Sequence, residues 1–299
     1  MTTLPSIKHK FSQIALIGAP NAGKSTLTNF LVGQKISIVS PKVQTTRNTI
    51  KAIMIEDQTQ IVFLDTPGVF IPQTSRPLER AIVRSAWQAI KEADFVCLLI
   101  DASKGLNDNN QQILKDLEFH AIKAIIVINK IDTIAKEKAL EIIAGLSEKG
   151  FEKIFLISAT TGDGVDDLKK YLISITGEGD WQFNDDEITD APMKFIASEI
   201  TREQLFLKLK QDLPYSLYVK TDSWEDLNNG QVKIYQTIYV LKESQKMIVL
   251  GKGGSMIREI GAEARKEIGE ILGTKVHLFL FVKVEEDWVN KKESYEQYN

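Results

Sequence analysis

The sequence predicts an α/β protein with two domains, the first built on a doubly wound, mostly parallel sheet and the second a smaller α+β domain. Up to about residue 176, short apolar runs alternate with amphipathic helical patterns. An acidic, glycine-bearing stretch with poor periodicity follows at 176–192. Beyond it the order changes to a helix, two strands, two helices and a strand. Alternating strands and helices favour a parallel sheet, whereas the later order favours a separate α+β unit.

In the first domain several apolar runs are continuous, as expected for strands that helices cover on both faces. Strands are expected at 14–18, 50–55, 60–65, 94–101, 123–129 and 153–158. Helices are expected at 24–31, 77–92, 108–120, 135–150 and 165–175.

The second domain is expected to contain a helix at 192–210, strands at 215–222, 231–241 and 275–284, and two helices around a glycine turn at 251–254. We place the first domain at 1–180, the linker at 181–191 and the second domain, with a C-terminal tail, at 192–299. Phe279 and Phe281 alternate in "HLFLFV" and are expected in the core.

Composition narrows the class of protein. The 299 residues fit two domains, and 43% hydrophobic with 26% charged residues is typical of soluble globular proteins. The net charge of -3 means that a nucleic-acid site must be a local basic patch. Cys97, the single cysteine, excludes an internal disulfide and lies in an apolar run, which favours a buried strand position over a reactive thiol. Without a signal-peptide-like start or an apolar run of membrane-spanning length, we expect a cytosolic protein.

The stretch "GAPNAGKST" at 18–26 fits the pattern G-x-x-x-x-G-K-[ST], after an expected strand and before an expected helix. Glycines allow backbone N–H groups to converge on phosphate oxygens, and the helix N-terminus adds positive potential. Lys24 can reach the β- and γ-phosphates, and the Ser25 hydroxyl can ligate Mg²⁺. The alternative, a glycine turn without a ligand, does not explain four constrained positions in this context. The expected phosphate-binding residues are Gly18, Asn21, Ala22, Gly23, Lys24, Ser25 and Thr26.

Three further short motifs end apolar strands. In "DTPG" (65–68), Asp65 can hold Mg²⁺ through water and the Gly68 N–H can meet the γ-phosphate. In "NKID" (129–132), Asp132 can accept from the guanine ring N–H and amine, which adenine lacks, so this motif favours GTP over ATP. "SAT" (158–160) can contact the guanine carbonyl. Each motif is weak alone, but strand C-termini are where such sheets bind ligands. The expected base-side residues are Asn129, Lys130, Asp132, Ser158 and Ala159.

Residues 14–176 therefore resemble translation-factor-type GTPases of the P-loop superfamily. The resemblance implies a first switch within 40–49, where Thr46 ligates Mg²⁺ in the GTP state, with Thr45 as the alternative. It implies a second switch at 68–77, and segments of this kind are held by the γ-phosphate and released on hydrolysis. We expect Lys24, Thr46 and Gly68 to form the catalytic set.

Two positions bear on the rate of hydrolysis. Ras-like enzymes orient the attacking water with a glutamine near this motif. Val69 follows Gly68 here and cannot polarise water, which predicts slow intrinsic hydrolysis aided by another element or a partner. Asn21 resembles the asparagine that holds a potassium ion in some GTPases, although a turn-forming residue is an equally good interpretation.

The second glycine loop, "GKGG" at 251–254, lacks the Walker spacing but fits G-x-x-G between two helices. With the order α-β-β-α-α-β it resembles a type II KH domain, whose loop clamps about four nucleotides of single-stranded RNA. A lone G-x-x-G more often ends a helix. From 233 to 258, however, five basic residues stand against one acidic residue. Bases are expected to meet the apolar surface around Ile248, Ile257 and the strand "KIYQTIYV". The expected RNA contacts are Lys246, Ile248, Gly251, Lys252, Gly253, Gly254, Ile257 and Arg258.

A GTPase domain followed by a type II KH domain resembles the bacterial Era family over essentially the whole chain, including 243–268 and 282–289. Ala19 departs from many members, which carry a charged residue there, but it supplies no fixed ligand. The resemblance implies GTP/GDP and Mg²⁺ as ligands, binding to 16S rRNA near its 3′ end and a role in 30S subunit assembly. It also implies peripheral association with the cytoplasmic face of the inner membrane.

Two other classes remain open at this point. One is a GTP-using RNA-modifying enzyme, which would need a further nucleophile or cofactor site that the sequence does not offer. The other is a membrane- or protein-interaction GTPase whose KH-like domain is a docking module.

Overall fold

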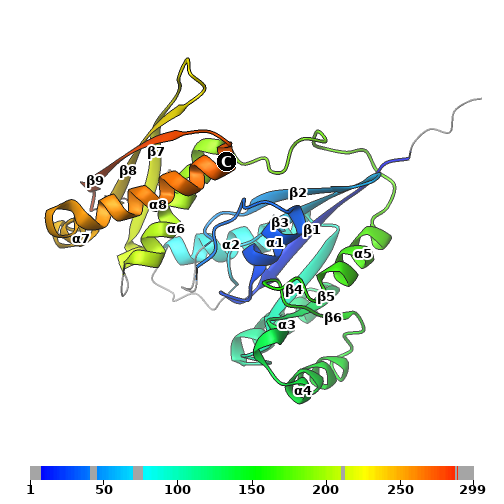
Figure 1. The fold of residues 1–299 in the computed structure, drawn as a ribbon. Coiled ribbons are helices and arrows are strands. Elements are labelled where there is room, and N and C mark those ends of the chain that lie inside the picture. The colour runs from blue at the N-terminus through cyan, green and yellow to red at the C-terminus, as the bar shows by residue number, and fades with distance from the viewer. Residues whose placement is uncertain (1–7, 41–45, 70–76, 210–212, 287, 289–299) are drawn as a thin grey trace, which may run out of the picture. The chain divides into compact units, whose positions relative to one another are not determined.

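The computed structural model describes residues 8–40, 46–69, 77–209, 213–286 and 288 (Figure 1). The chain divides into two compact units. The first consists of Met1–Ser37 with Thr46–Asp190, and the second of Ile38–Thr45 with Ala191–Asn299.

The first unit is built on a six-stranded sheet with the order β2-β3-β1-β4-β5-β6. Its strands are β1 Lys10–Gly18, β2 Ile50–Glu56, β3 Thr59–Asp65, β4 Phe95–Asp101, β5 Ala124–Asn129 and β6 Ile154–Leu156. Neighbouring strands run parallel except β2, which is antiparallel to β3. This confirms the prediction of a mostly parallel sheet.

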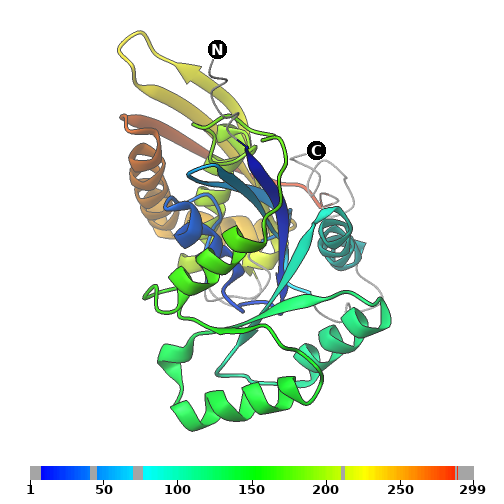
Figure 2. The same ribbon diagram turned by 90° about the vertical axis from the view of Figure 1, so that its right-hand side faces the viewer.

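Helices cover both faces of this sheet (Figures 1 and 2). Helices α1 (Lys24–Val32) and α5 (Val165–Ile175) pack on one face through side chains such as Leu27 and Leu168. Helices α2 (Pro77–Glu92), α3 (Asp108–Phe119) and α4 (Lys136–Ser147) pack on the other. This double cover explains why all seven residues of β3 are buried. Cys97 on β4 is fully buried, as predicted, and burial raises the pKa of its thiol to about 12.

The parallel register brings the carboxyl ends of the strands to one edge. Leu16 pairs with Asp65, and Gly18 pairs with Leu99. Asp101 at the end of β4 pairs with Asn129 at the end of β5. Motifs far apart in the sequence therefore start from adjacent points of the sheet.

The stretch expected as a linker is held against the first unit. The backbone N–H of Phe11 donates to the carbonyl of Gly177 at 3.1 Å, and that of Ile53 donates to Ile188 at 2.8 Å. The amide of Gln60, fully buried on β3, donates to the Phe183 carbonyl at 2.8 Å. The chain after α5 thus follows the sheet before it enters the second unit at Ala191.

The second unit has the predicted order of elements. Its members are α6 Met193–Lys208, β7 Leu217–Asp226, β8 Val232–Val240, α7 Glu243–Leu250, α8 Ser255–Leu272 and β9 Val276–Val284. Strands β7 and β8 pair antiparallel, while β8 and β9 pair parallel. The core joins Leu205, Ile238, Val249 and Ile260 from four of these elements.

The prediction that Phe279 and Phe281 lie in the core was wrong. Their side chains are 43% and 55% exposed, because on β9 it is Leu280 and Val282 that pack against the helices. The two phenylalanines lie on the opposite side and stack on Tyr235 of β8, with ring centroids 4.9 and 6.4 Å away. The sheet buries one face only, and in "HLFLFV" both sets of alternating residues are apolar, so the pattern did not indicate which set faces inward.

Candidate functional site

The phosphate loop joins β1 to α1 under tight steric control. A Cβ placed on Gly23 would lie 2.1 Å from the side-chain amide nitrogen of Asn129. A Cβ on Gly68 would lie 2.7–2.8 Å from atoms of Pro20. The glycines of "GAPNAGKST" and "DTPG" are therefore required because the strand-end loops approach one another closely.

Lys24 lies across this loop and is only 6% exposed. Its Nζ donates to the carbonyls of Gly18 and Ala19 at 3.1 and 3.2 Å. Burial lowers the pKa of Lys24 to about 8, and nearby Asp65 offsets part of that effect. A phosphate bound at the loop would accept a charge-assisted hydrogen bond from the Lys24 ammonium and stabilise its charged form.

Beside Lys24, hydroxyls and a carboxylate converge as a Mg²⁺ site requires. The hydroxyls of Ser25 and Thr46 are 3.0 Å apart. Asp65 is fully buried, and neither of its carboxylate oxygens has a hydrogen-bond partner among the described residues. Burial raises the pKa of Asp65, and the opposing effects of Lys24 and of the nearby Ser25 and Ser37 hydroxyls offset only part of the rise. Thr45, the alternative to Thr46, lies outside the described residues.

The hydroxyl and carboxylate oxygens of this site fit Mg²⁺ better than a metal whose ligands all come from protein side chains. Over the part of the chain that the structure describes, no group of three or more His, Cys, Asp and Glu residues could hold a metal ion. A cation between Ser25 and Asp65 would complete its shell with phosphate oxygens and water, which is how Mg²⁺ is usually bound.

Asn129 ties three motifs together. Its side-chain amide donates to the Ala22 carbonyl at 2.8 Å. Its Oδ1 accepts from the backbone N–H groups of Lys130 at 2.8 Å and Ala159 at 2.9 Å. With these bonds and 2% exposure, the Asn129 side chain holds the phosphate loop and the two base-side loops in register.

Asp132 is exposed to solvent, whereas Asn129 is buried. It lies in a short 3-10 turn, Ile131–Thr133, and is exposed. Ser158 is buried, with its Oγ accepting from the Thr161 N–H at 3.3 Å. The carboxylate of Asp132 is thus available to a ligand at the edge that Ala159 also borders.

The remaining positions of the phosphate loop and of the segment after "DTPG" are Asn21, Thr26 and Val69. Asn21 has a left-handed φ of 64°, which a turn residue of the phosphate loop requires. Thr26 lies in the first turn of α1. Val69 is 5% exposed, and its backbone N–H donates to the Gly18 carbonyl at 3.0 Å. Its side chain packs in the core beneath α2 and α3, so it presents no polar atom to a water.

Sequence reasoning missed three residues of this site, namely Asp101, Ser37 and Asn29. Asp101 accepts a hydrogen bond from the Lys130 ammonium at 2.8 Å. Ser37 is held by Asn29, whose Oδ1 accepts from the Ser37 N–H at 2.9 Å and whose amide donates to the Ser37 carbonyl at 2.7 Å. Asp101 could have been found, because it ends an apolar strand as Asp65 and Asn129 do.

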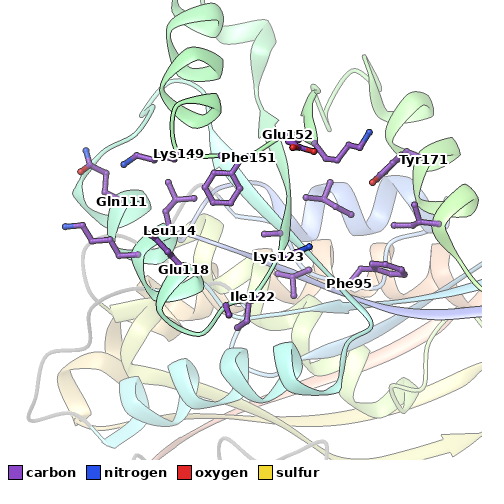
Figure 3. Close-up of a pocket in the computed structure, with 18 residues that line it drawn as sticks. Phe95, Gln111, Leu114, Glu118, Ile122, Lys123, Lys149, Phe151, Glu152 and Tyr171 are labelled. Carbon is purple, nitrogen blue, oxygen red and sulfur yellow. The ribbon is translucent and has the colours of Figure 1, made fainter.

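A separate cavity of about 700 Å³ lies at the opposite edge of the sheet (Figure 3). It is lined by residues at the starts of β4 and β5, among them Phe95 and Ala124, and by Phe151 and Tyr171. No residue of the four nucleotide motifs lines it. The nucleotide loops, which follow the carboxyl ends, are thus distinct from this hollow.

In the second unit, the "GKGG" loop is closed at one end and open at the other. A Cβ on Gly251 would lie 2.7 Å from the Met256 side chain, whereas nothing lies within 4 Å of a Cβ on Gly253 or Gly254. Lys252 is exposed at the tip. A polymer backbone can therefore approach the loop at Gly253 and Gly254.

Around this loop, exposed apolar and basic groups alternate. Met247 and Ile248 at the end of α7 are 64% and 54% exposed, while Ile257 on α8 is half-buried. Arg258 donates to the carbonyls of Gly253 at 3.0 Å and Gly254 at 3.1 Å, so it braces the loop. Lys246 lies 3.8 Å from Glu243. On "KIYQTIYV", by contrast, Ile234, Ile238 and Val240 are fully buried in the core.

Comparison with known proteins accounts for both units. A family model described as a 50S ribosome-binding GTPase matches residues 13–130, and a KH domain model matches residues 212–289. The GTPase Era of Bradyrhizobium sp. (strain ORS 278) is 51% identical over 95% of this chain and 92% of its own length. That of Agrobacterium fabrum is 50% identical over 95% of this chain and 89% of its own length. The chain belongs to the GTPase Era family.

Solved structures of Era agree. One, Era in complex with MgGDPNP and nucleotides 1506–1542 of 16S ribosomal RNA, has a TM-score of 0.92 and 36% identity, covering 97% of this chain and 99% of that one. An Aquifex aeolicus Era variant bound to GDP and AlF4⁻ matches with the same TM-score, identity and coverage. The predicted fold, a P-loop GTPase domain followed by a KH domain, is confirmed, and the chain is a GTPase.

Two further features of the described residues concern the single thiol and the helices. The buried Cys97, with its raised thiol pKa, is unsuited to be the nucleophile that an RNA-modifying enzyme would need. Among the helices in the described ranges, none has both the length and the apolar character that crossing a membrane demands.

Proposed function

We propose that this chain is a GTP-hydrolysing switch that acts in the cytosol, binds single-stranded 16S rRNA near its 3′ end through its second unit, and assists assembly of the 30S subunit. The observation that carries the proposal is the pairing, in one chain, of an enclosed phosphate loop with an open G-x-x-G loop. The Era relative crystallised with MgGDPNP and a 16S rRNA segment supports it.

In the nucleotide site, Lys24 binds the β- and γ-phosphates, and the Gly68 N–H meets the γ-phosphate. Ser25 and Thr46 ligate Mg²⁺ directly, while Asp65 holds it through water. The 3.0 Å approach of Thr46 to Ser25 favours Thr46 over Thr45 in this role. When bound, Mg²⁺ neutralises charge between the β- and γ-phosphates. The backbone N–H groups of residues 21–26 face the phosphates, with Gly18 and Gly23 allowing their close approach.

On the base side, Asp132 accepts from the guanine ring N–H and amine, while Lys130, Ser158 and Ala159 border the base. Asn129 holds these loops in place through its bonds to Ala22, Lys130 and Ala159. Because Val69 offers no polar group, intrinsic hydrolysis is slow. We assign Asn21 a potassium ion, and a faster turnover in K⁺ than in Na⁺ at equal ionic strength is the result that would support it.

In the RNA site, Lys252 contacts phosphate, and Gly253 and Gly254 admit the backbone. Gly251 shapes the loop, Arg258 braces it, and Ile248, Ile257 and Lys246 border the bases. Peripheral association with the inner membrane remains a prediction of the family resemblance, which flotation with lipid vesicles would test.

The proposal is tested by sedimentation of the full-length protein with 30S particles, before and after RNase treatment. RNase-sensitive association, together with binding of a 16S 3′-end oligonucleotide, is the expected result. Association that survives RNase would contradict it and favour a protein-docking role for the second unit.

A further inference from the structure

Lys130, the second residue of "NKID", makes hydrogen bonds through both its backbone and its side-chain ammonium. Its backbone has a left-handed φ of 66°, and its N–H donates to Asn129 Oδ1 at 2.8 Å. Its carbonyl accepts from the Thr133 hydroxyl at 2.7 Å. At the far end, its Nζ donates to Asp101 Oδ2 at 2.8 Å. The conformation of a lysine, a residue with high side-chain entropy, is set here before any ligand arrives.

The anchor is itself rigid. Asp101 is 4% exposed at the end of β4, directly opposite Asn129 in the parallel ladder. Its Oδ1 accepts from the Ser103 N–H at 3.0 Å and from the Ser103 hydroxyl at 2.6 Å. Burial alone would raise the pKa of Asp101, but hydrogen bonds from Lys130 and Ser103 outweigh it and lower the pKa. The carboxylate therefore stays charged and fixed in orientation.

This anchorage changes what Lys130 presents to a ligand. With the ammonium tied to the end of β4, the methylene stem must span two neighbouring strands, which lie about 4.8 Å apart. The stem lies at the edge that Asp132 and Ala159 border, and the Lys130 side chain is still 33% exposed. Because the ammonium is held by Asp101, the methylene stem of Lys130 is also held in place. It offers an apolar surface against which a flat ring can pack.

We propose that Asp101 is a positioning residue of the base site, which holds Lys130 so that its stem packs against the guanine ring. This role rests on guanine-nucleotide binding at the same edge. It differs from that of an ordinary surface ion pair, which contributes little, because the acidic partner is buried and doubly bonded to Ser103.

The test is a double-mutant cycle on the full-length protein, read as the dissociation rate of fluorescent mant-GDP with Mg²⁺ present. Asp101→Asn preserves side-chain volume and should raise the dissociation rate about tenfold, as expected when a charge-assisted hydrogen bond is lost. Lys130→Ala should raise it at least as much. The double variant should dissociate no faster than Lys130→Ala alone, because Asp101 acts only through Lys130.

Lys104→Ala is the control, since it changes an exposed side chain of the same loop but leaves Asp101, Ser103 and Lys130 in place, and its rate should stay within about twofold of the parent. Two results would overturn the inference: a parent-like dissociation rate for Asp101→Asn, or additive effects of the two substitutions, which a merely structural role would give. Failure of the proposed function would instead be visible in the parent, as an absence of mant-GDP binding.

Discussion

The molecule carries two glycine-rich loops, each leading into a helix, and their surroundings differ. In the phosphate loop at 18–26, a Cβ on Gly23 would collide with Asn129 at 2.1 Å, and Lys24 is 6% exposed. In the loop at 251–254, nothing lies within 4 Å of a Cβ on Gly253, and Lys252 is exposed. The first loop is enclosed by other parts of its unit, whereas the second projects from its own.

This difference matches two kinds of phosphate ligand. An enclosed loop with a buried lysine suits a ligand whose phosphates are fixed in number and position, such as a nucleotide. An open loop suits a polymer whose backbone passes over it and continues in both directions. Glycine content alone does not separate these cases, because close approach from within the protein and from a ligand both require glycine.

Removing the buried cation should have the largest effect. We expect Lys24→Ala to lower the GTP hydrolysis rate by roughly 10³–10⁵-fold, the same size of effect as an arginine finger has at a transferred phosphoryl group. The measurement is single-turnover hydrolysis, with Lys104→Ala, an exposed lysine after β4, as the control. The open loop should be unaffected, so the RNA affinity of nucleotide-free protein should match the parent. A variant that hydrolyses GTP within tenfold of the parent would contradict the assignment of the enclosed loop.

Altering the base site should have the next largest effect. Asp132→Asn should weaken GDP binding by roughly 10²–10⁴-fold, since two hydrogen bonds to a charged group are lost. Binding of xanthosine diphosphate should improve, because the new amide can donate to the additional carbonyl. Competition against mant-GDP measures both affinities. Unchanged preference for guanine would show that "NKID" does not read the base.

The open loop is tested by Lys252→Asp combined with Gly253→Asp. RNA affinity should fall by about 10²-fold, because carboxylates face phosphates and a side chain blocks backbone approach. Basal GTP hydrolysis should stay near that of the parent. Binding by the parent should also weaken with rising salt, as counterion release requires.

The chain supplies a matched control for this double variant. Lys149→Asp with Gly150→Asp makes the same change at an exposed Lys–Gly pair, and both Gly150 and Gly253 have positive φ. It should leave RNA affinity unchanged. If both double variants lose the same affinity, the loss reflects net charge and not the "GKGG" loop.

Much of the site could be predicted because the chemistry follows strand ends. Apolar runs located the parallel strands, and the residues that follow them, including Asp65 and Asn129, meet at one edge by geometry alone. The "GKGG" loop was recognisable from its position between two helices. These features depend on local spacing, which a sequence displays directly.

Features that depend on register or on which face is covered could not be predicted. The pairing of Asp101 with Lys130 requires β4 and β5 to be neighbours in a particular register. The exposure of Phe279 and Phe281 follows from a sheet that helices cover on one face only. Ser37 is positioned by Asn29 from an adjoining helix, and no motif marks that pair.

The smallest predicted effect, a pH dependence, arises from the enclosure of Lys24. In the free site the pKa of Lys24 is lowered to about 8, mainly by burial. Bound phosphates favour the charged amine and raise that pKa, so the complex holds more protons than the free protein above pH 8. Nucleotide affinity should therefore fall as pH rises from 8 to 9.5, by at most about tenfold per pH unit, and this group should contribute no change below about pH 7.

The open loop offers the contrast that makes this prediction informative. Lys24 belongs to the enclosed loop, so RNA affinity should not share the fall in nucleotide affinity over the same pH range. The measurements are mant-GDP affinity and 16S 3′-end oligonucleotide affinity from pH 7 to 9.5 at constant ionic strength. Lys24→Gln, which cannot titrate, should bind mant-GDP weakly and without this pH dependence. A flat mant-GDP profile in the parent would mean that Lys24 remains charged in the free loop, and that its enclosure leaves the amine better solvated than the geometry indicates.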